Sequence, residues 1–294
     1  MFSIIIPVYN ESLALPHFLD ELRNEISNIS LPVEIIFIED CSTDDSSVIL
    51  SKFAEHSINV MDVKLLHNQI NLGYGASIKR GLKSSKFNLC AITDSDTTYS
   101  VRELLDLMSK YQPNSSSMLV GARSGKFYQG GLVKKYLRKA LRVIVEYMAN
   151  RSISDVNSGI RVFDKRIILD DMHLLSDRFS FTTSLTLVFM LKGEIVNYSP
   201  VTYRKRSGGS KVRLFSDSIR TLALITAVSF YFSPLKVLYP IILIFIFASV
   251  VVLLLSILNY SNFLLLIGAF CFINLFITIG FGLLAQLLSF GLRS

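Results

Sequence analysis

Three clusters of acidic and small polar residues follow short apolar segments, and their residue types are those best suited to chemistry. They are residues 7–11 (Pro-Val-Tyr-Asn-Glu), residues 39–45 (Glu-Asp-Cys-Ser-Thr-Asp-Asp) and Asp94-Ser95-Asp96. Two carboxylates at D-x-D spacing can share a hard divalent cation with phosphate oxygens. The other two clusters can hold ribose hydroxyls and a base edge. The simpler interpretations are a surface turn for the D-x-D and helix N-caps for the other two clusters.

A glycine-containing segment, Asn71-Leu72-Gly73-Tyr74-Gly75-Ala76, leads into a helical pattern that carries Lys79 and Arg80. Its spacing matches neither the Walker loop nor the dinucleotide-binding fingerprint. The glycines therefore either bring the chain against a phosphate or only permit a tight turn.

Short apolar runs alternate with helical patterns through the first part of the chain. The predicted strands are residues 2–8, 33–39, 60–67, 87–93 and 118–122, and the predicted helices are residues 12–27, 45–56, 74–83 and 102–110. This alternation predicts an α/β fold with a mostly parallel, doubly wound sheet. Asn10 and Asp44 are predicted N-caps. Because such sheets bind ligands outside the carboxyl ends of their strands, the position of the D-x-D favours a metal–diphosphate site.

Composition indicates that part of the chain lies in lipid. Hydrophobic residues make up 51% of the 294 residues and charged residues only 18%, against about 25% charged in an average soluble domain. No Asp, Glu, Lys or Arg occurs from Val237 to Leu292, which argues against a purely soluble protein and against a disordered tail. Residues 237–258 and 263–290 are each long enough to cross a bilayer and predict a transmembrane hairpin. The alternative is a buried helical pair in a soluble protein.

The flanks of this hairpin predict its orientation. Lys236 precedes it and Arg293 follows it, while the turn carries no charge, so both ends are expected in the cytosol. The three cysteines have no close spacing, which predicts neither a disulfide framework nor a zinc knuckle. The N-terminus lacks a signal-peptide pattern. We therefore expect the first domain to remain in the cytosol.

Six motifs occur in an order that carries a family resemblance: residues 4–11, residues 39–44, Asn71-x-Gly73-x-Gly75, Asp94-Ser95-Asp96, Gly121-Ala122-Arg123 and residues 155–163. The chain resembles the inverting family-2 glycosyltransferases of GT-A fold. It looks closest to the polyprenyl-phosphate group, which includes dolichol-phosphate mannose synthase and bactoprenol glucosyltransferases. The resemblance covers nearly the whole chain, including the hairpin.

The resemblance implies a set of site residues. The donor nucleotide sugar, linked to UDP or GDP, would be held by Pro7, Tyr9, Glu11, Asp40, Asp94 and Ser95. Mg²⁺ or Mn²⁺ would be held by Asp94 and Asp96, and the acceptor phosphate by Arg123, Arg161, Arg206 and Lys211. Catalytic roles would fall to Asp96, Arg123 and Asp155; Asp155 either orients Arg123 or Arg161, touches the acceptor region, or is structural.

The sequence departs from the family pattern in three places. Glu39 stands where Asp is usual, and Thr97-Thr98 follows the D-x-D where Leu-Gln is frequent. The loop of residues 204–211 fits R-x-x-G-x-S-K only with Lys205 in the arginine position. The first two departures leave the donor sugar open, and the third leaves open whether Lys205 or Arg206 is the functional cation.

A basic segment and a second helix are expected at the membrane surface. Residues 126–142 contain six Lys or Arg and no acidic residue, interleaved with apolar residues. This pattern is typical of an amphipathic helix on an anionic membrane; the alternative is a solvated charged face. We expect a GT-A domain over residues 1–210, an interface helix over 211–236 and two transmembrane helices over 237–294.

The sequence thus predicts a membrane-anchored enzyme that transfers a sugar to a polyprenyl phosphate at the cytosolic face of the cytoplasmic membrane, or of the endoplasmic reticulum in a eukaryote. An acceptor phosphate is already dianionic near neutral pH, so no general base is required. The alternatives are transfer to another lipid such as diacylglycerol, whose hydroxyl needs a base, and a silent nucleotide-sugar binder. We expect membrane lipid as a partner, self-association as a possibility, and no nucleic acid, because no nucleic-acid module is recognised.

Overall fold

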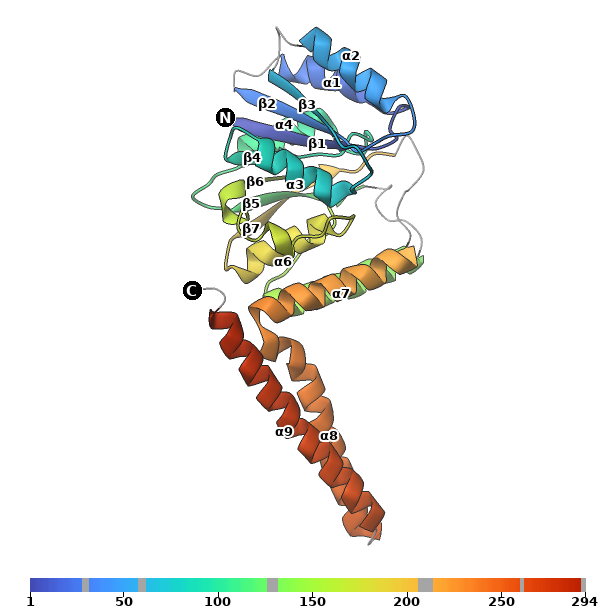
Figure 1. Cartoon of the computed structure of the whole chain (residues 1–294), viewed down its shortest axis with the longest axis vertical. Helices are drawn as coiled ribbons and strands as arrows, with labels where there is room; N and C mark the ends of the chain where they lie inside the picture. Colours follow the sequence, from blue (N-terminus) through green and yellow to red (C-terminus); the bar gives the residue numbers. More distant parts are fainter. Residues whose placement is uncertain (28–31, 58–61, 126–131, 206–213, 260–261, 292–294) are drawn as a thin grey trace. The chain divides into compact units, whose positions relative to one another are not determined.

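The computed structural model describes residues 1–27, 32–57, 62–125, 132–205, 214–259 and 262–291 (Figure 1). The chain forms two compact units, Met1–Leu224 and Ile225–Ser294. All three acidic clusters belong to the first unit, and the charge-free stretch belongs to the second.

A sheet in the order β3-β2-β1-β4-β6-β5-β7 forms the centre of the first unit. Its strands are β1 Phe2–Val8, β2 Val33–Glu39, β3 Asp62–His67, β4 Leu89–Ile92, β5 Met118–Ser124, β6 Arg161–Asp164 and β7 Val196–Thr202. Five of them lie where the sequence predicts strands. The other two, β6 and β7, are additional, and β6 runs antiparallel to both of its neighbours. It escapes prediction because its four residues begin with an arginine and contain no apolar run.

Helices follow the strands as the alternation predicts. The helices of the first unit are α1 Leu15–Ile26, α2 Ser46–Ser57, α3 Tyr74–Ser84, α4 Val101–Lys110, α5 Leu132–Ala149 and α6 Phe181–Leu191, with two 3₁₀ turns, η2 Lys165–Ile167 and η3 Met172–Leu174. Helix α7, Leu214–Phe232, extends from the first unit into the second.

Both faces of the sheet are covered because side chains alternate along each strand. Ile4 and Ile6 of β1 pack with Phe18 of α1 and Leu104 of α4 in one apolar core. Ile5 points to the other face, where the backbone of α3 approaches so closely that a Cβ at Gly81 would lie 2.6 Å from its side chain. The prediction of an α/β sheet with helices on both faces is confirmed.

The start of α1 differs from the prediction. Its N-cap is Ala14, without a side-chain hydrogen bond, and a proline follows in the first turn. Asn10 instead adopts a left-handed backbone conformation with φ of 51°, and its Oδ1 accepts a hydrogen bond from Thr43 N at 2.7 Å. The prediction of Asn10 as an N-cap is therefore wrong. The side chain of Asn10 bonds to Thr43, across the edge of the sheet, and is not used to cap α1.

The second unit contains α8 Pro234–Asn259 and α9 Asn262–Gly291. Spans of 25 and 30 residues in these helices are long and apolar enough to cross a membrane, and only 6% of each apolar window is buried inside the chain. A buried pair in a soluble core would hide these side chains instead. Within the unit, a Cβ at Gly282 of α9 would lie 2.7 Å from Leu235 of α8, so the glycine allows the two helices to pack closely.

Candidate active site

Backbone strain marks the ends of three neighbouring strands. Among the described residues, four that are not glycine have positive φ, and three of them are Asn10 at 51°, Cys41 at 58° and Thr97 at 64°. These follow β1, β2 and the D-x-D after β4. Side chains with a Cβ rarely adopt this conformation, and such strain collects at functional sites. The carboxyl edge of the sheet is therefore the place to look for chemistry.

The first two corners are joined by hydrogen bonds. Asn10 N donates to Ser42 Oγ at 3.1 Å, and Ser12 N donates to Asp44 Oδ2 at 3.0 Å. The other oxygen of Asp44 accepts from Ser46 N in the first turn of α2, as its predicted capping role requires. Partial burial alone would raise the pKa of Asp44, but these hydrogen bonds lower it to about 2. Tyr9 and Glu11 lie half-buried at the same edge.

Asp40 is almost fully buried, and its carboxylate holds the glycine-containing loop. Oδ1 accepts from Asn68 Nδ2 at 2.7 Å and from Leu72 N at 2.9 Å, and Oδ2 accepts from Gly73 N at 2.8 Å. Contacts with its own chain thus engage both oxygens. The structure shows Asp40 orienting the loop before α3, and the nucleoside contact that the resemblance implies for it stays a prediction.

The glycines of this loop allow close packing. A Cβ at Gly73 would lie 2.6 Å from the carbonyl oxygen of Asp177, and a Cβ at Gly75 would lie 2.0 Å from that of Ser176. Lys79 pairs with Asp177 at 2.8 Å, and Arg80 donates to the His67 carbonyl at 2.7 Å. The positive φ of Gly73, 104°, agrees with the tight turn expected from the sequence, and the close packing against residues 176–178 is a further reason for both glycines.

The D-x-D carboxylates are both constrained. Tyr74 Oη donates to Asp94 Oδ1 at 2.9 Å, and Asp96 Oδ1 accepts from Thr98 N at 3.0 Å. Between them, Ser95 Oγ donates to the Pro7 carbonyl at 3.4 Å, which ties the turn to β1. Burial and the charge of Asp94 raise the pKa of Tyr74 well above its ordinary value, so its phenol remains a donor.

The donor set at this turn fits a hard cation only in part. In the chain as described, no group of three or more His, Cys, Asp or Glu side chains comes together to hold a metal. Two carboxylates are oxygen ligands of the kind that Mg²⁺ prefers, and Mg²⁺ is usually bound through one or two carboxylates plus substrate phosphates. The site therefore suits a cation that a bound diphosphate helps to hold.

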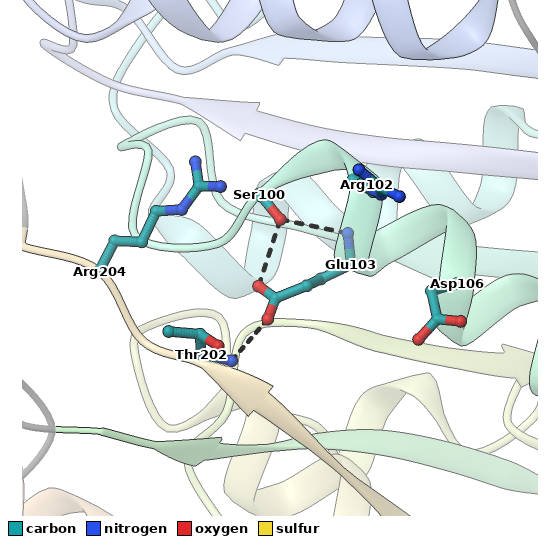
Figure 2. A pocket seen from close by; sticks show the side chains of 6 residues that line it. All are labelled: Ser100, Arg102, Glu103, Asp106, Thr202 and Arg204. Atoms are coloured by element: carbon teal, nitrogen blue, oxygen red, sulfur yellow. Dashed lines mark hydrogen bonds between the residues drawn. The ribbon is translucent and has the colours of Figure 1, made fainter.

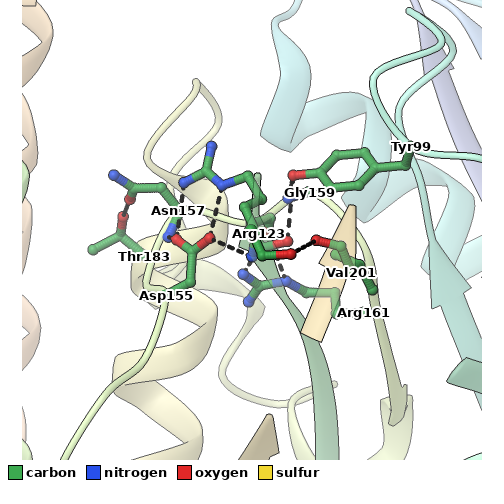
Figure 3. Close-up of polar contacts among 10 residues, drawn as sticks. Tyr99, Arg123, Asp155, Asn157, Gly159, Arg161, Thr183 and Val201 are labelled. Carbon is green, nitrogen blue, oxygen red and sulfur yellow. Dashed lines mark hydrogen bonds and ion pairs between the residues drawn. The ribbon is translucent and has the colours of Figure 1, made fainter. Parts of the chain in front are cut away.

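Arg123 and Asp155 form the second part of the site (Figure 3). Arg123 Nε and Nη2 donate to the two carboxylate oxygens at 2.7 and 2.8 Å, and Arg123 N donates to Oδ2 at 3.1 Å. Burial alone would raise the pKa of Asp155, but the hydrogen bonds and charge of Arg123 lower it. Asp155 is therefore an anion that fixes the guanidinium.

Tyr99 connects the two parts of the site. Its hydroxyl accepts from Gly159 N at 3.1 Å (Figure 3), and a Cβ at Gly159 would lie 2.2 Å from Asp94 Oδ2. Burial raises the pKa of Tyr99, and the charges of Arg123 and Asp94 also act on it, one in each direction. The ring of Tyr99 also packs against that of Tyr203, with centroids 5.5 Å apart, and Tyr203 in turn contacts Arg123, so the D-x-D and the Arg123–Asp155 pair belong to one site.

Arg161 does not reach this site. It is fully buried, and its guanidinium donates to the carbonyl of Ser158 at 2.6 Å, to the carbonyl of Thr182 at 3.0 Å and to Thr186 Oγ1 at 3.0 Å. The expected contact with the acceptor phosphate requires exposure that this position does not provide. Its side chain instead holds the turn before β6.

The basic loop after β7 starts beside the D-x-D. Tyr203 places its ring 5.5 Å from the guanidinium carbon of Arg123, and Arg204 N donates to the Thr98 carbonyl at 2.9 Å. The Arg204 side chain turns away, to 3.6 Å from Glu21, and lines a depression of ≈ 350 Å³ with Glu103 and Thr202 (Figure 2). Arg206 and Lys211 lie outside the described residues.

The sequence did not single out Tyr74, Tyr99, Tyr203 or Gly159 as parts of the site. Gly159 lies inside the quoted motif of residues 155–163, so the motif was the available signal. Tyr74 lies inside the glycine-containing segment of residues 71–76, but Tyr99 and Tyr203 offered no signal, because an isolated tyrosine is more often a core residue. The contacts of Tyr74 with Asp94 and of Tyr99 with Gly159 join residues that are 20 and 60 positions apart.

Comparison with known proteins identifies the family and the fold. Residues 3–172 match the Glycosyl transferase family 2. Glucosyl-3-phosphoglycerate synthase from Mycobacterium tuberculosis, in complex with Mn²⁺, UDP and glucosyl-3-phosphoglycerate, has the same fold, with a TM-score of 0.58 at 15% identity over 78% of this chain and 80% of that one. The fold and the motifs thus define a GT-A glycosyltransferase. The chain belongs to glycosyl transferase family 2.

Two relatives of known name are similar in sequence. Dolichyl-phosphate beta-glucosyltransferase of Dictyostelium discoideum is 28% identical over 240 residues, which cover 74% of this chain and 70% of that protein. Undecaprenyl-phosphate 4-deoxy-4-formamido-L-arabinose transferase of Pseudomonas savastanoi pv. phaseolicola is 28% identical over 188 residues, which cover 64% of this chain and 54% of that protein.

Proposed function

We propose that this protein transfers a sugar from a nucleoside diphosphate sugar to a polyprenyl phosphate, with inversion at the anomeric carbon. The Arg123–Asp155 pair is the observation that carries the choice of acceptor. Asp155 is a buried carboxylate that Arg123 keeps ionised and hydrogen-bonded, so it is a poor general base. A phosphate acceptor needs no base. The named relatives act on dolichyl and undecaprenyl phosphates, which supports the proposal.

In the proposed reaction, a phosphate oxygen of the acceptor attacks the anomeric carbon, and the bond from that carbon to the donor's diphosphate oxygen breaks. Asp94 and Asp96 would hold Mg²⁺ or Mn²⁺, which stabilises the charge of the departing nucleoside diphosphate. Arg123, fixed by Asp155, would align the acceptor phosphate together with Arg206 and Lys211 of the basic loop. Pro7, Tyr9 and Glu11 would contact the nucleoside at the edge of β1.

We propose that α8 and α9 anchor the enzyme in a membrane and that α5 lies on its cytosolic surface. Helix α5 exposes Lys135, Lys139 and Arg142 together with Tyr136 and Val143. Cations and apolar side chains on one exposed helix suit an anionic interface. In this arrangement residues 1–210 form the catalytic domain, 211–236 the interface helix and 237–294 the anchor.

The test is incubation of the purified full chain with a polyprenyl phosphate and, in turn, UDP-glucose, UDP-N-acetylglucosamine and GDP-mannose, followed by mass spectrometry of the lipid fraction. We expect one donor to give the glycosylated lipid phosphate. Diacylglycerol in place of the polyprenyl phosphate tests the second acceptor class. Product from diacylglycerol alone would support transfer to another lipid instead. Nucleotide binding without any product would support a silent nucleotide-sugar binder.

A further inference from the structure

The carboxylate of Asp94 is held from two opposite sides. On one side, Tyr74 Oη donates to Oδ1 at 2.9 Å. On the other, the Cα of Gly159 lies so close that a Cβ there would be 2.2 Å from Oδ2. A carboxylate without such contacts rotates about its last bond. Here, the hydroxyl and the glycine together select one orientation.

Tyr74 is itself fixed by contacts outside the D-x-D. Its ring stacks on Phe179, with centroids 6.1 Å apart and ring planes at 21°. The loop before it is held by Asp40, which accepts from Leu72 N and Gly73 N. The first turn of its helix is held by the hydrogen bond from Ala76 N to the Asp177 carbonyl at 3.0 Å. The hydroxyl is thus placed by rigid surroundings.

The opposite wall is equally constrained. Gly159 N donates to Tyr99 Oη at 3.1 Å, and Arg161 donates to the carbonyl of the preceding Ser158 at 2.6 Å. Neither contact requires a ligand. The orientation of Asp94 is therefore set before any substrate binds.

From this geometry we propose that Tyr74 is a positioning residue that orients Asp94 for binding the divalent cation. The inference rests on the proposed metal site at Asp94 and Asp96. Groups that hydrogen-bond to a metal ligand orient it, and their loss typically weakens metal affinity or activity by about 10- to 100-fold. Tyr74 makes such a hydrogen bond to Asp94. The same role connects Asp40 to the site, because Asp40 holds the loop that places Tyr74 against Asp94.

The test compares Tyr74→Phe with the parent full chain in detergent, using calorimetric titration of UDP and GDP at a series of Mn²⁺ concentrations and without metal. Tyr74→Phe keeps the ring and its stacking but removes the hydroxyl. The matched control is Tyr111→Phe, which removes a hydroxyl that donates to the Ser117 carbonyl at 3.2 Å, away from the D-x-D. We expect Tyr74→Phe to reach the nucleotide affinity of the parent only when the Mn²⁺ concentration is raised by about 10-fold or more. Metal-free nucleotide binding should stay as in the parent, and the control should behave as the parent.

Three outcomes would overturn the inference. One is an unchanged Mn²⁺ requirement in Tyr74→Phe while the parent depends on Mn²⁺, which leaves the proposed function intact. Another is an equal loss of affinity without metal, which would make Tyr74 a nucleotide contact. The third is a nucleotide affinity of the parent that does not change with Mn²⁺ concentration, which would contradict both the proposed metal site and the inference.

A second variant separates the hydroxyl from packing. Phe179→Leu removes the stacked ring at an exposed position and keeps the tyrosine hydroxyl. We expect its Mn²⁺ requirement to stay close to that of the parent. A shift as large as that of Tyr74→Phe would assign the effect to packing and contradict the positioning role.

Discussion

Arg123 and Asp155 lie 32 residues apart in the chain and are joined by two parallel side-chain hydrogen bonds of 2.7 and 2.8 Å. The Asp155 side chain is 4% exposed and that of Arg123 is 13% exposed, so water screens the pair poorly. A pair of this geometry holds the guanidinium plane in one orientation. The acceptor phosphate would therefore meet a cation that is already aligned.

Arg123→Lys keeps the charge but cannot form both parallel hydrogen bonds. We expect transfer to polyprenyl phosphate to fall by about 100-fold through misalignment, with Mn²⁺-dependent UDP or GDP binding unchanged. Steady-state kinetics on both substrates measure this. The control is Arg166→Lys, which alters an exposed two-pronged pair with Asp164 and should leave the kinetics unchanged. If UDP or GDP binding weakens while the dependence of the rate on polyprenyl phosphate concentration stays the same, Arg123 contacts the donor and not the acceptor.

Acid should remove the stabilisation that Asp155 provides. Its pKa in the folded protein is lowered by Arg123, which outweighs the effect of burial. The contribution is therefore complete above the unfolded pKa of about 3.9 and is lost as pH falls through the lowered folded value. We expect the difference in unfolding free energy between the parent and Asp155→Asn to narrow from pH 4 downwards, as chemical denaturation would measure. A difference that stays constant over that range would contradict the lowered pKa.

Removal of the metal, or of one of its proposed ligands, should stop the reaction. We expect EDTA to abolish transfer and Mg²⁺ or Mn²⁺ to restore it, because the departing diphosphate needs a cation. Asp96→Asn should remain folded and lose activity, with melting temperature as the check on folding. Asp106→Asn, at an exposed residue paired with Lys110, is the control. Full turnover by folded Asp96→Asn would show that this carboxylate is not a ligand.

Neutralising the basic loop should affect the lipid rather than the nucleotide. Arg206→Ala and Lys211→Ala remove cations that we propose attract the acceptor phosphate to a membrane surface that is itself negative. We expect KM for polyprenyl phosphate to rise and the affinity for UDP or GDP to stay the same. Lys110→Ala, on α4, tests the effect of a lost charge alone. If the affinity for UDP or GDP falls instead, these cations contact the departing diphosphate of the donor and not the acceptor phosphate.

Cys41→Gly should be more stable than Cys41→Ala. Cys41 has φ of 58°, a conformation that costs a residue with a Cβ about 1–2 kcal/mol and costs glycine little. The greater freedom of glycine in the unfolded chain offsets part of the gain. We expect Cys41→Gly to unfold at higher denaturant than Cys41→Ala, which also lacks the thiol but keeps the strained Cβ. Equal stability of the two variants would show that the backbone is not strained there.

Much of the fold could be predicted from local pattern. Strands β1, β2 and β5 start where the apolar runs start, and α3 starts at Tyr74 as predicted. The hairpin was equally predictable, because residues without charge over two bilayer-length spans have few other stable environments. The spacing of apolar and polar residues along a strand or helix involves only residues close in the chain, so it can be read from one sequence.

Contacts between distant segments decided the rest. Asn10 has the residue type of an N-cap, but its side chain accepts from Thr43 across the sheet edge. Arg161 has the residue type of a phosphate ligand, but β6 pairs with β4 and β5 on either side and places Arg161 inside the sheet. The antiparallel direction of β6 also brings Gly159 against Asp94, which no spacing in the sequence predicts.

The sequence by itself therefore determined most of the elements of the first half of the chain, the two apolar segments long enough to cross a bilayer and most of the polar residues that the site draws on. Tertiary structure decided which of them act on one another: Asp40 on the loop before α3, Tyr74 on Asp94, and Asp155 on Arg123. The physical reason is that hydrogen-bond direction and close approach depend on three-dimensional distances between segments 20 to 33 residues apart. Residue type specifies only what a side chain can donate, accept or bury.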